Sequence, residues 1–151
     1  MSSSAAPVVL YAEDDPDDRL LAEMAHRDSG SVNPLVFVGD GVEALEYLRC
    51  TGRHADRADA RQPGIILLDL NMPAMGGLET LRTIRADSAL RRIPVVILTT
   101  SAAAEDIAAS YDAGANSYIV KPSAFAGLVE IFESVCRYWF SIGSLVTEAP
   151  C

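Results

Sequence analysis

Five short apolar segments, rich in β-branched residues, alternate along this chain with segments of helical periodicity. They cover residues 7–12, 34–38, 64–70, 94–98 and 117–120, and a predicted helix follows each of them. A strand, a helix and a second strand in succession form a right-handed crossover, which makes the two strands parallel. The alternation therefore predicts an α/β fold with a doubly wound, five-stranded parallel sheet and five helices.

Local capping signals mark where the first predicted helices begin. Asp15 can cap the first helix, with Pro16 at its first position, and Asp40 can cap the second. An apolar face at helical spacing is expected to pack the first helix on the sheet. This face consists of Leu20, Leu21, Met24 and Ala25.

The chain has the length of one ordinary domain. Half of its 151 residues are apolar, which is enough for one hydrophobic core. We expect a disordered N-terminus over residues 1–6, a domain over 7–140 and a C-terminal tail over 141–151. Within the domain, the polar segment 51–62 lacks an apolar period and is predicted to be an exposed insertion.

The composition excludes two classes of partner. The 21 acidic residues outnumber the 12 Lys and Arg, and the net charge of -9 has the wrong sign for binding a nucleic-acid backbone. No apolar stretch approaches the length of a bilayer span, and the N-terminus carries no secretory signal. We therefore expect a cytoplasmic protein that binds neither nucleic acid nor membrane.

The cysteines and histidines show neither a metal-binding pattern nor a disulfide framework. Cys50, Cys136 and Cys151 are widely spaced and are expected to be reduced thiols. His26 and His54 lie in polar stretches without a partner three or four residues away, and both are expected to be exposed. Neither residue type is therefore assigned to a site.

Acidic and phosphate-binding side chains follow the predicted strands at their carboxyl ends. In a parallel sheet these ends share one edge, where open α/β sheets bind ligands. Packing alone gives no reason to collect carboxylates, which repel one another. The residues that reach this edge are Glu13, Asp14, Asp15, Asp69, Asn71, Thr99, Thr100 and Lys121.

A hard divalent cation would relieve the repulsion between these carboxylates. Mg²⁺ favours an octahedral shell of oxygen atoms from one or two carboxylates, water and a phosphate group. Glu13, Asp14, Asp69 and one backbone carbonyl, that of Asn71, supply such oxygens. The sequence therefore predicts a Mg²⁺ site, with Mn²⁺ as the alternative ion.

The remaining groups at this edge suit a phosphoryl group. Thr99 and Lys121 can donate hydrogen bonds to its oxygens, and a cation offsets its charge. A carboxylate can accept a phosphoryl group as an aspartyl phosphate when the protein positions the reactants and stabilises the charge. Asp69, at the end of the most hydrophobic strand, is therefore the predicted nucleophile.

Taken in order, these motifs resemble the receiver domains of bacterial two-component response regulators. The likeness extends roughly from Pro7 to Phe140. It implies the strand order 2-1-3-4-5 of such domains. The motifs that carry it are the acidic pair Glu13 and Asp14, LLDLNMP with Asp69, LTTS with Thr99, and YIVKP with Lys121 and Pro122.

The resemblance also implies roles for residues at the sheet edge. Asp69 would be the phosphoacceptor, and Glu13 and Asp14 would bind the metal. Lys121 would contact the phosphoryl group, and the peptide bond between Lys121 and Pro122 would be cis.

A second implication of the resemblance is a conformational switch. Thr99 would move toward the phosphoryl group, and Tyr118 would turn inward into the space that Thr99 vacates. These movements would bias the surface formed by the fourth helix, the fifth strand and the fifth helix.

Within that family, the chain resembles the stand-alone regulators paired with bacterial and cyanobacterial phytochrome kinases. This narrower likeness is carried by EDDPDD, DGVEALEYLR, the insertion before the third strand, IPVVILTTS and RYWF. It implies a partner sensor histidine kinase, of the phytochrome type, that donates the phosphoryl group to Asp69. The chain would then be a phosphoacceptor that promotes its own phosphotransfer and dephosphorylation, and not an enzyme.

Two positions depart from the family pattern and bear on the lifetime of the phosphoryl group. Gly76 and Gly77 stand where relatives carry an Asp-Gly pair, so a helix-capping carboxylate is absent. Thr100 stands where many relatives carry Ala or Gly, and its bulk is expected to restrict access to the phosphoryl group.

The last predicted helix, residues 123–140, carries more apolar surface than one helix on one sheet can cover. One stripe at helical spacing is expected in the core. The apolar residues outside that stripe predict a homodimer interface. The alternative is that the C-terminus folds back on its own domain. The core stripe is Phe125, Leu128, Val129, Phe132, Cys136 and Trp139, and the predicted dimer interface is Ile131, Val135, Tyr138, Trp139 and Phe140.

Three other functions remain as alternatives. A haloacid-dehalogenase-type phosphatase would need a second Asp where this chain has Asn71, and a flavodoxin-like electron carrier would need a phosphate loop where this chain has carboxylates. A receiver-like scaffold that binds partners without phosphorylation is the more serious alternative. The intact set of Asp69, Thr99 and Lys121 argues against it.

Overall fold

A parallel sheet of five strands forms the centre of the molecule. The computed structural model describes residues 6–57 and 61–146. The strands lie in the order β2-β1-β3-β4-β5, and all neighbours are parallel, which confirms the predicted fold. Their bounds are Val9–Ala12 (β1), Leu35–Val38 (β2), Ile65–Leu68 (β3), Val95–Thr99 (β4) and Ser117–Val120 (β5).

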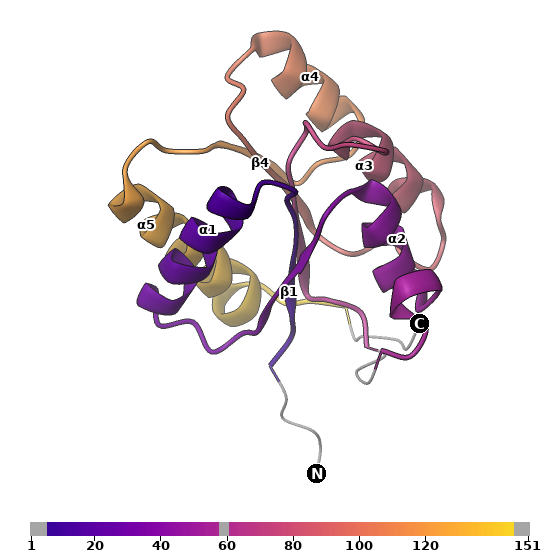
Figure 1. Ribbon diagram of the computed structural model, residues 1–151, viewed down its shortest axis with the longest axis horizontal. Helices are drawn as coiled ribbons and strands as arrows, with labels where there is room; N and C mark the ends of the chain where they lie inside the picture. The colour runs from indigo at the N-terminus through magenta and orange to yellow at the C-terminus, as the bar shows by residue number, and fades with distance from the viewer. Residues whose placement is uncertain (1–5, 58–60, 147–151) are drawn as a thin grey trace.

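Helices cover both faces of this sheet. Figure 1 shows α1 and α5 on one side and α2, α3 and α4 on the other. Two apolar cores result, one under each helical layer. The helices are Pro16–Asp28 (α1), Gly41–Arg49 (α2), Gly77–Ala86 (α3), Ala104–Asp112 (α4) and Phe125–Arg137 (α5); a short 3-10 helix (η1) spans Gly52–His54, and a π-helical turn (η2) spans Tyr138–Ile142.

The three interior strands β1, β3 and β4 are buried along their whole length. Helices lie over both faces, so each apolar side chain of these strands enters one core or the other. The register pairs Ala12 with Leu68, which places Glu13 and Asp69 next to each other just past the strand ends. The fold itself therefore positions two carboxylates at one edge.

The predicted caps of α1 and α2 are confirmed. The Asp15 carboxylate accepts hydrogen bonds from the backbone N–H groups of Asp17 and Asp18. The Asp40 carboxylate accepts one from the N–H of Glu43 at 2.8 Å. Both caps satisfy donors that a helix start leaves unpaired, which is why the sequence marks these boundaries.

The predicted packing face of α1 is wrong in three of its four residues. Leu20, Leu21 and Met24 are exposed, whereas Ala22 and Ala25 are buried. Helix α1 packs along α5 as well as on the sheet. We attribute the buried face to this close approach, which favours the smallest apolar side chains.

The start of the predicted insertion is attached to α2. The Arg53 Nε lies 2.7 Å from a Glu46 carboxylate oxygen, and the His54 Nε2 lies 2.9 Å from Glu43 Oε2. The prediction of an exposed, unpartnered His54 is therefore wrong, because its partner lies 11 residues away and not within one helical turn. Residues 58–60 of the predicted insertion lie outside the described residues.

The predictions for His26 and for the cysteines also need correction. His26 is half-buried, with its ring edge against Phe132 of α5 at a centroid distance of 5.5 Å, because α1 and α5 are in contact. Cys50 is disulfide-bonded, so the expectation of reduced thiols fails there. Cys136 is a free thiol in the core, where burial raises its pKa. Cys151 lies outside the described residues.

The expected cis peptide bond between Lys121 and Pro122 is absent. All peptide bonds in residues 6–57 and 61–146 are trans. The trans form is the intrinsically favoured isomer before proline, by about 0.5–1 kcal/mol. That prediction is therefore wrong.

Other predictions concern the chain ends and the membrane. Residues 1–5 of the predicted N-terminus and residues 147–151 of the predicted C-terminal tail lie outside the described residues. The tail predicted for 141–151 begins within η2, which extends to Ile142. Within the part that the structure describes, no helix is both long and apolar enough to span a bilayer.

Candidate phosphoacceptor site

Two buried carboxylates define the site at the carboxyl end of the sheet. The Glu13 residue is 1% exposed and Asp69 is 8% exposed. Glu13 follows β1, and Asp69 follows β3, the neighbouring strand. Carboxylates are rarely buried unless they are paired or bind a cation, so a positive charge is needed here.

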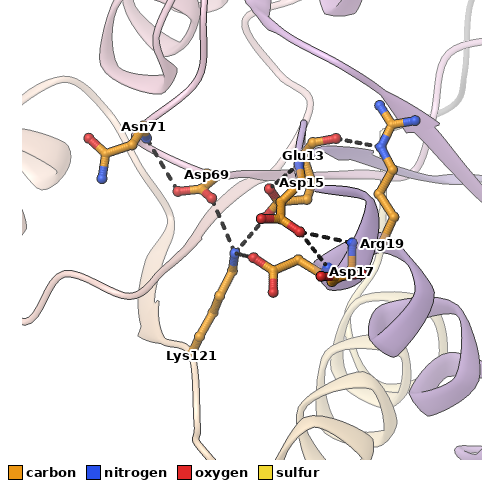
Figure 2. A network of polar contacts seen from close by, with 8 residues as sticks. Glu13, Asp15, Asp17, Arg19, Asp69, Asn71 and Lys121 are labelled. Carbon is orange, nitrogen blue, oxygen red and sulfur yellow. Dashed lines mark hydrogen bonds and ion pairs between the residues drawn. The ribbon is translucent and has the colours of Figure 1, made fainter.

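Lys121 supplies that charge in the structure. Figure 2 shows its side chain reaching toward Glu13 and Asp69. The ammonium nitrogen lies 2.5 Å from Glu13 Oε1, 3.1 Å from Asp69 Oδ2 and 3.2 Å from Asp18 Oδ2. An ammonium group has three donors, and each has one carboxylate partner.

The electrostatics of the site follow from burial and from this contact. Burial raises the pKa of the Glu13 carboxyl, and the hydrogen bond from Lys121 opposes that rise. Burial by itself lowers the pKa of the Lys121 ammonium, but the carboxylates of Glu13 and Asp69 outweigh it and raise that pKa. Lys121 is therefore fully charged at neutral pH.

Thr99 brings an unused hydroxyl group to the same edge. It is the last residue of β4 and is fully buried, and its Oγ1 has no hydrogen-bond partner among the described residues. The backbone N–H of Lys121 donates to its carbonyl oxygen at 2.7 Å, which joins the ends of β4 and β5. A buried hydroxyl without a partner is costly, which makes Thr99 a candidate to bind a ligand oxygen at this edge.

The start of α1 holds the Glu13 loop in place. Glu13 Oε2 accepts a hydrogen bond from the N–H of Asp15 at 3.0 Å. Arg19 Nε donates to the carbonyl oxygen of Glu13 at 2.5 Å. These contacts, visible in Figure 2, fix the direction of the Glu13 carboxylate toward Lys121.

The predicted metal ligands are only partly assembled. Glu13 and Asp69 both contact Lys121, Asp14 is exposed beside them, and Asn71 donates its N–H to Asp69 Oδ1 at 3.3 Å. Over residues 6–57 and 61–146, no three acidic, histidine or cysteine side chains surround a common ion position. The ammonium of Lys121 lies between the carboxylates instead.

The donor set nevertheless fits a hard divalent cation. Glu13, Asp18 and Asp69 place three negative charges around the single positive charge of Lys121. Glu13 and Asp69, with Asp14 beside them, offer oxygen atoms, which are the ligands that Mg²⁺ and Mn²⁺ prefer, whereas Asp18 contacts the ammonium. The excess negative charge and the free hydroxyl of Thr99 are consistent with a site for a cation and an anionic group together.

A glycine lets α3 begin close to the phosphoacceptor candidate. A Cβ atom on Gly77 would lie 2.1 Å from the backbone oxygen of Asp69, so only glycine fits there. Gly76, the N-cap of α3, makes no side-chain cap, which agrees with the missing capping carboxylate noted in the sequence. Thr100 is exposed beside the site.

Tyr118 connects β5 to the loop that follows Thr99. Its hydroxyl group donates to the backbone oxygen of Ser101 at 2.8 Å, and its ring packs against the core beneath α2 and α3. The switch roles of Thr99 and Tyr118 stay predictions, but the loop between them gives a direct structural connection.

The residues predicted for a dimer interface lie in three different environments. Val135 is buried in the core, and Ile131, Trp139 and Phe140 are partly buried against that same core. Tyr138 is exposed. Most of this apolar surface is therefore covered by the domain itself, as the alternative of a folded-back C-terminus predicts.

Asp18 is the site residue that the sequence did not assign to this edge. Its acidic character was explained by its position in the first turn of α1. Its contact with Lys121 spans 103 residues, and no local pattern reveals such a distance. The five acidic residues of EDDPDD were the only available signal.

Known sequences match this chain along most of its length. The family model of the response regulator receiver domain matches residues 9–133. The response regulator Rcp1 of Synechocystis sp. is 33% identical over 147 residues, which are 96% of this chain and 98% of Rcp1.

Solved structures of similar proteins have the same fold. The phosphorylated cyanobacterial phytochrome response regulator RcpA has a TM-score of 0.85 at 38% identity, covering 95% of this chain and all 100% of that one. The response regulator RPA3017, in red light signalling of R. palustris, has a TM-score of 0.87 at 40% identity, covering 93% of this chain and 99% of that one. The Mn²⁺-bound form of Rcp1 has a TM-score of 0.81 at 32% identity, covering 93% of this chain and 99% of that one.

Proposed function

Because the chain belongs to the response regulator receiver domain family, we propose that Asp69 accepts a phosphoryl group from the phosphohistidine of a partner sensor histidine kinase. The single observation that supports this most strongly is the grouping of Asp69, Lys121 and the unpartnered Thr99 hydroxyl at one sheet edge. In the transfer, an oxygen of Asp69 forms a bond to phosphorus as the bond from phosphorus to the histidine nitrogen breaks.

The residues around Asp69 have distinct tasks in this reaction. Lys121 and Thr99 donate hydrogen bonds to the phosphoryl oxygens, which stabilises the charge that develops there. Glu13, Asp14, Asp69 and the backbone carbonyl of Asn71 would hold Mg²⁺, or Mn²⁺ in its place. The ion, when bound, offsets phosphate charge. Hydrolysis in the same site would return the carboxylate and release phosphate, so the chain is a phosphoacceptor and not an enzyme acting on a separate substrate.

The test of this function is the intact mass of the protein after incubation with acetyl phosphate. We expect one added phosphoryl group, and only when Mg²⁺ is present. No adduct, together with no response to beryllofluoride, would instead support the scaffold that binds partners without phosphorylation.

The kinase partner is proposed to be of the phytochrome type, and the protein is proposed to act in the cytoplasm. The support is the similarity to RcpA and Rcp1 over nearly the whole chain. The output would be an altered surface of α4, β5 and α5, reached through the contact between Tyr118 and the loop at Ser101. A homodimer through Ile131 and Val135 of α5 and through Tyr138, Trp139 and Phe140 of η2 remains part of the proposal.

The exposed apolar residues of α1 are proposed to contact this kinase. Leu20, Leu21 and Met24 are exposed on the helix whose first turn carries Asp18, at the site. We expect a Leu20→Ser, Met24→Ser variant to lose about tenfold in phosphotransfer from the kinase, which corresponds to about 1.4 kcal/mol. Its rate with acetyl phosphate should not change, because a small donor needs no docking surface. The comparison of both donors in rapid-quench assays measures this.

A control for surface hydrophobicity is available in the same region. Val32 is 84% exposed, in the connection between α1 and β2, away from the site. A Val32→Ser variant should behave as wild type with both donors. An equal loss with both donors in the Leu20→Ser, Met24→Ser variant would contradict the docking role.

A substitution at Thr99 is expected to affect the stability and the function of the protein differently. Because its hydroxyl is buried without a partner, Thr99→Val should leave the free energy of unfolding unchanged or raise it by about 1 kcal/mol. In the same variant, the structural change that phosphorylation causes at Tyr118 should be absent. Adding beryllofluoride in place of the phosphoryl group should then leave the NMR shifts of Tyr118 unchanged. Urea unfolding measures the stability.

Thr80 is the matched control for that substitution. It is also fully buried, but its Oγ1 donates to the carbonyl oxygen of Gly76 at 2.7 Å. Thr80→Val should therefore lower the free energy of unfolding by about 1–2 kcal/mol. Equal destabilisation of both variants would show that the Thr99 hydroxyl has a partner after all.

A further inference from the structure

Lys121 has one carboxylate partner that the phosphoryl reaction does not use. Glu13 and Asp69 lie at strand ends and belong to the proposed cation and phosphoryl site, whereas Asp18 is in the first turn of α1. The Asp18 Oδ2 lies 3.2 Å from the ammonium nitrogen, and its side chain is 41% exposed against 12% for Lys121. The N–H of Asp18 donates to Asp15 Oδ1 at 3.1 Å, so the backbone of this turn is fixed.

A divalent cation and the Lys121 ammonium compete for the same oxygens. A cation bound by Glu13 and Asp69 competes for the oxygens that the ammonium contacts at 2.5 and 3.1 Å, because the second oxygen of each carboxylate already accepts a backbone N–H. Lys121 must then give up at least one of these contacts. A buried ammonium that loses its partners carries a large cost unless another anion is within reach.

The structure provides both the anion and the space. Asp18, in the first turn of α1, is already in contact with the ammonium. A small cavity of about 60 Å³ is lined by Lys121 and by Asp18 and Leu21 of α1, with Tyr11 and Leu128 also among its walls. This cavity offers space on the α1 side into which the Lys121 ammonium can shift.

We propose that Asp18 is a positioning residue that retains Lys121 while Glu13 and Asp69 change partners from the ammonium to a divalent cation. This inference rests on the proposed function of the site. With Asp18 present, the displaced ammonium keeps a carboxylate partner, so the cation binds at a lower cost. Without Asp18, displacement would leave the ammonium with no carboxylate, and cation affinity would fall.

The first measurement is the affinity for Mg²⁺ without any phosphoryl donor, from NMR titration of the amides at the strand ends. We expect Asp18→Asn to raise the dissociation constant about threefold to fivefold, the range for a partly exposed ion pair. The second measurement is the initial rate of phosphorylation by acetyl phosphate against Mg²⁺ concentration. The half-saturating Mg²⁺ concentration should rise by the same factor, while the rate at saturating Mg²⁺ stays within about twofold of wild type.

Asp17→Asn is the matched control. It removes the same charge from the same helical turn, but its carboxylate makes no contact with Lys121 in the structure. We expect its Mg²⁺ dissociation constant to stay close to that of wild type. Equal shifts in both variants would mean a general charge effect and would overturn the inference, as would an unchanged affinity in Asp18→Asn.

A double-mutant cycle with Lys121→Ala identifies the route of the effect. If Asp18 acts by retaining the ammonium, Asp18→Asn should have no effect on Mg²⁺ affinity once Lys121 is replaced. A shift that persists undiminished in that background would overturn the inference. A wild-type protein that binds Mg²⁺ but forms no adduct would contradict the proposed function alone, whereas one that binds no Mg²⁺ would overturn both.

Discussion

The Asp69→Asn variant is expected to gain no phosphoryl group from acetyl phosphate or from a kinase. An amide is not a nucleophile toward phosphorus under these conditions, so the loss should exceed about a hundredfold and fall below detection. Intact mass after incubation with the donor and Mg²⁺ measures it directly. Every other group of the site is unchanged in this variant, so the result depends on the carboxylate alone.

The fold of that variant should remain intact. The Asn side chain occupies nearly the same volume, and its oxygen can still accept the hydrogen bond that Lys121 donates at 3.1 Å. Asp17→Asn, the same chemical change on an exposed neighbour, should be phosphorylated as wild type. Phosphate on the Asp69→Asn variant at the wild-type rate would place the acceptor elsewhere and would contradict the assignment.

The Lys121→Ala variant is expected to lose about 2–4 kcal/mol of its free energy of unfolding when no divalent cation is present. Removing one partner of a buried ion pair leaves the other charge uncompensated, and here three carboxylates lose their common partner. Urea unfolding in the presence of a chelator measures the loss. Millimolar Mg²⁺ should restore much of it, because a ligand that binds only the folded state stabilises that state.

The pH dependence of this loss has a definite sign. Burial raises the folded-state pKa of Glu13, and Lys121 opposes that rise in the wild type. Without Lys121 the folded-state pKa rises further above the unfolded value. A carboxyl group whose pKa is higher in the folded state destabilises the fold at pH values where the same group is ionised in the unfolded chain. This penalty disappears as the pH falls below the pKa that the group has in the unfolded chain. The stability difference between wild type and variant should therefore shrink as pH is lowered from neutral.

An exposed ion pair provides the control for the Lys121 experiment. Arg27 pairs with Glu23 at 3.7 Å on the surface of α1, where both side chains are largely exposed. Arg27→Ala should change the free energy of unfolding far less, and Mg²⁺ should have no specific effect on it. Loss of stability in Lys121→Ala that Mg²⁺ does not reverse would argue against a cation site between Glu13 and Asp69.

Local patterns in the sequence were sufficient to predict the architecture and the edge where the site lies. The β-branched segments and the caps at Asp15 and Asp40 depend on interactions within a few residues of the chain. In a parallel sheet, strand direction alone brings the residues after β1, β3, β4 and β5 together. Glu13, Asp69 and Lys121 could therefore be grouped before their distances were known.

The tertiary structure determined which partners these side chains contact. Asp18 reaches Lys121 across 103 residues, and His54 reaches Glu43 across 11, at spacings that no helical or strand period encodes. The buried face of α1 is set by its contact with α5, which selects Ala22 and Ala25 over larger neighbours. Hydrophobic periodicity depends only on the residues within one segment, whereas these contacts depend on how closely separate elements pack. The sequence by itself thus determined the fold and the location of the phosphoacceptor candidate, and the packing of helices on the sheet determined that Lys121 lies among three carboxylates.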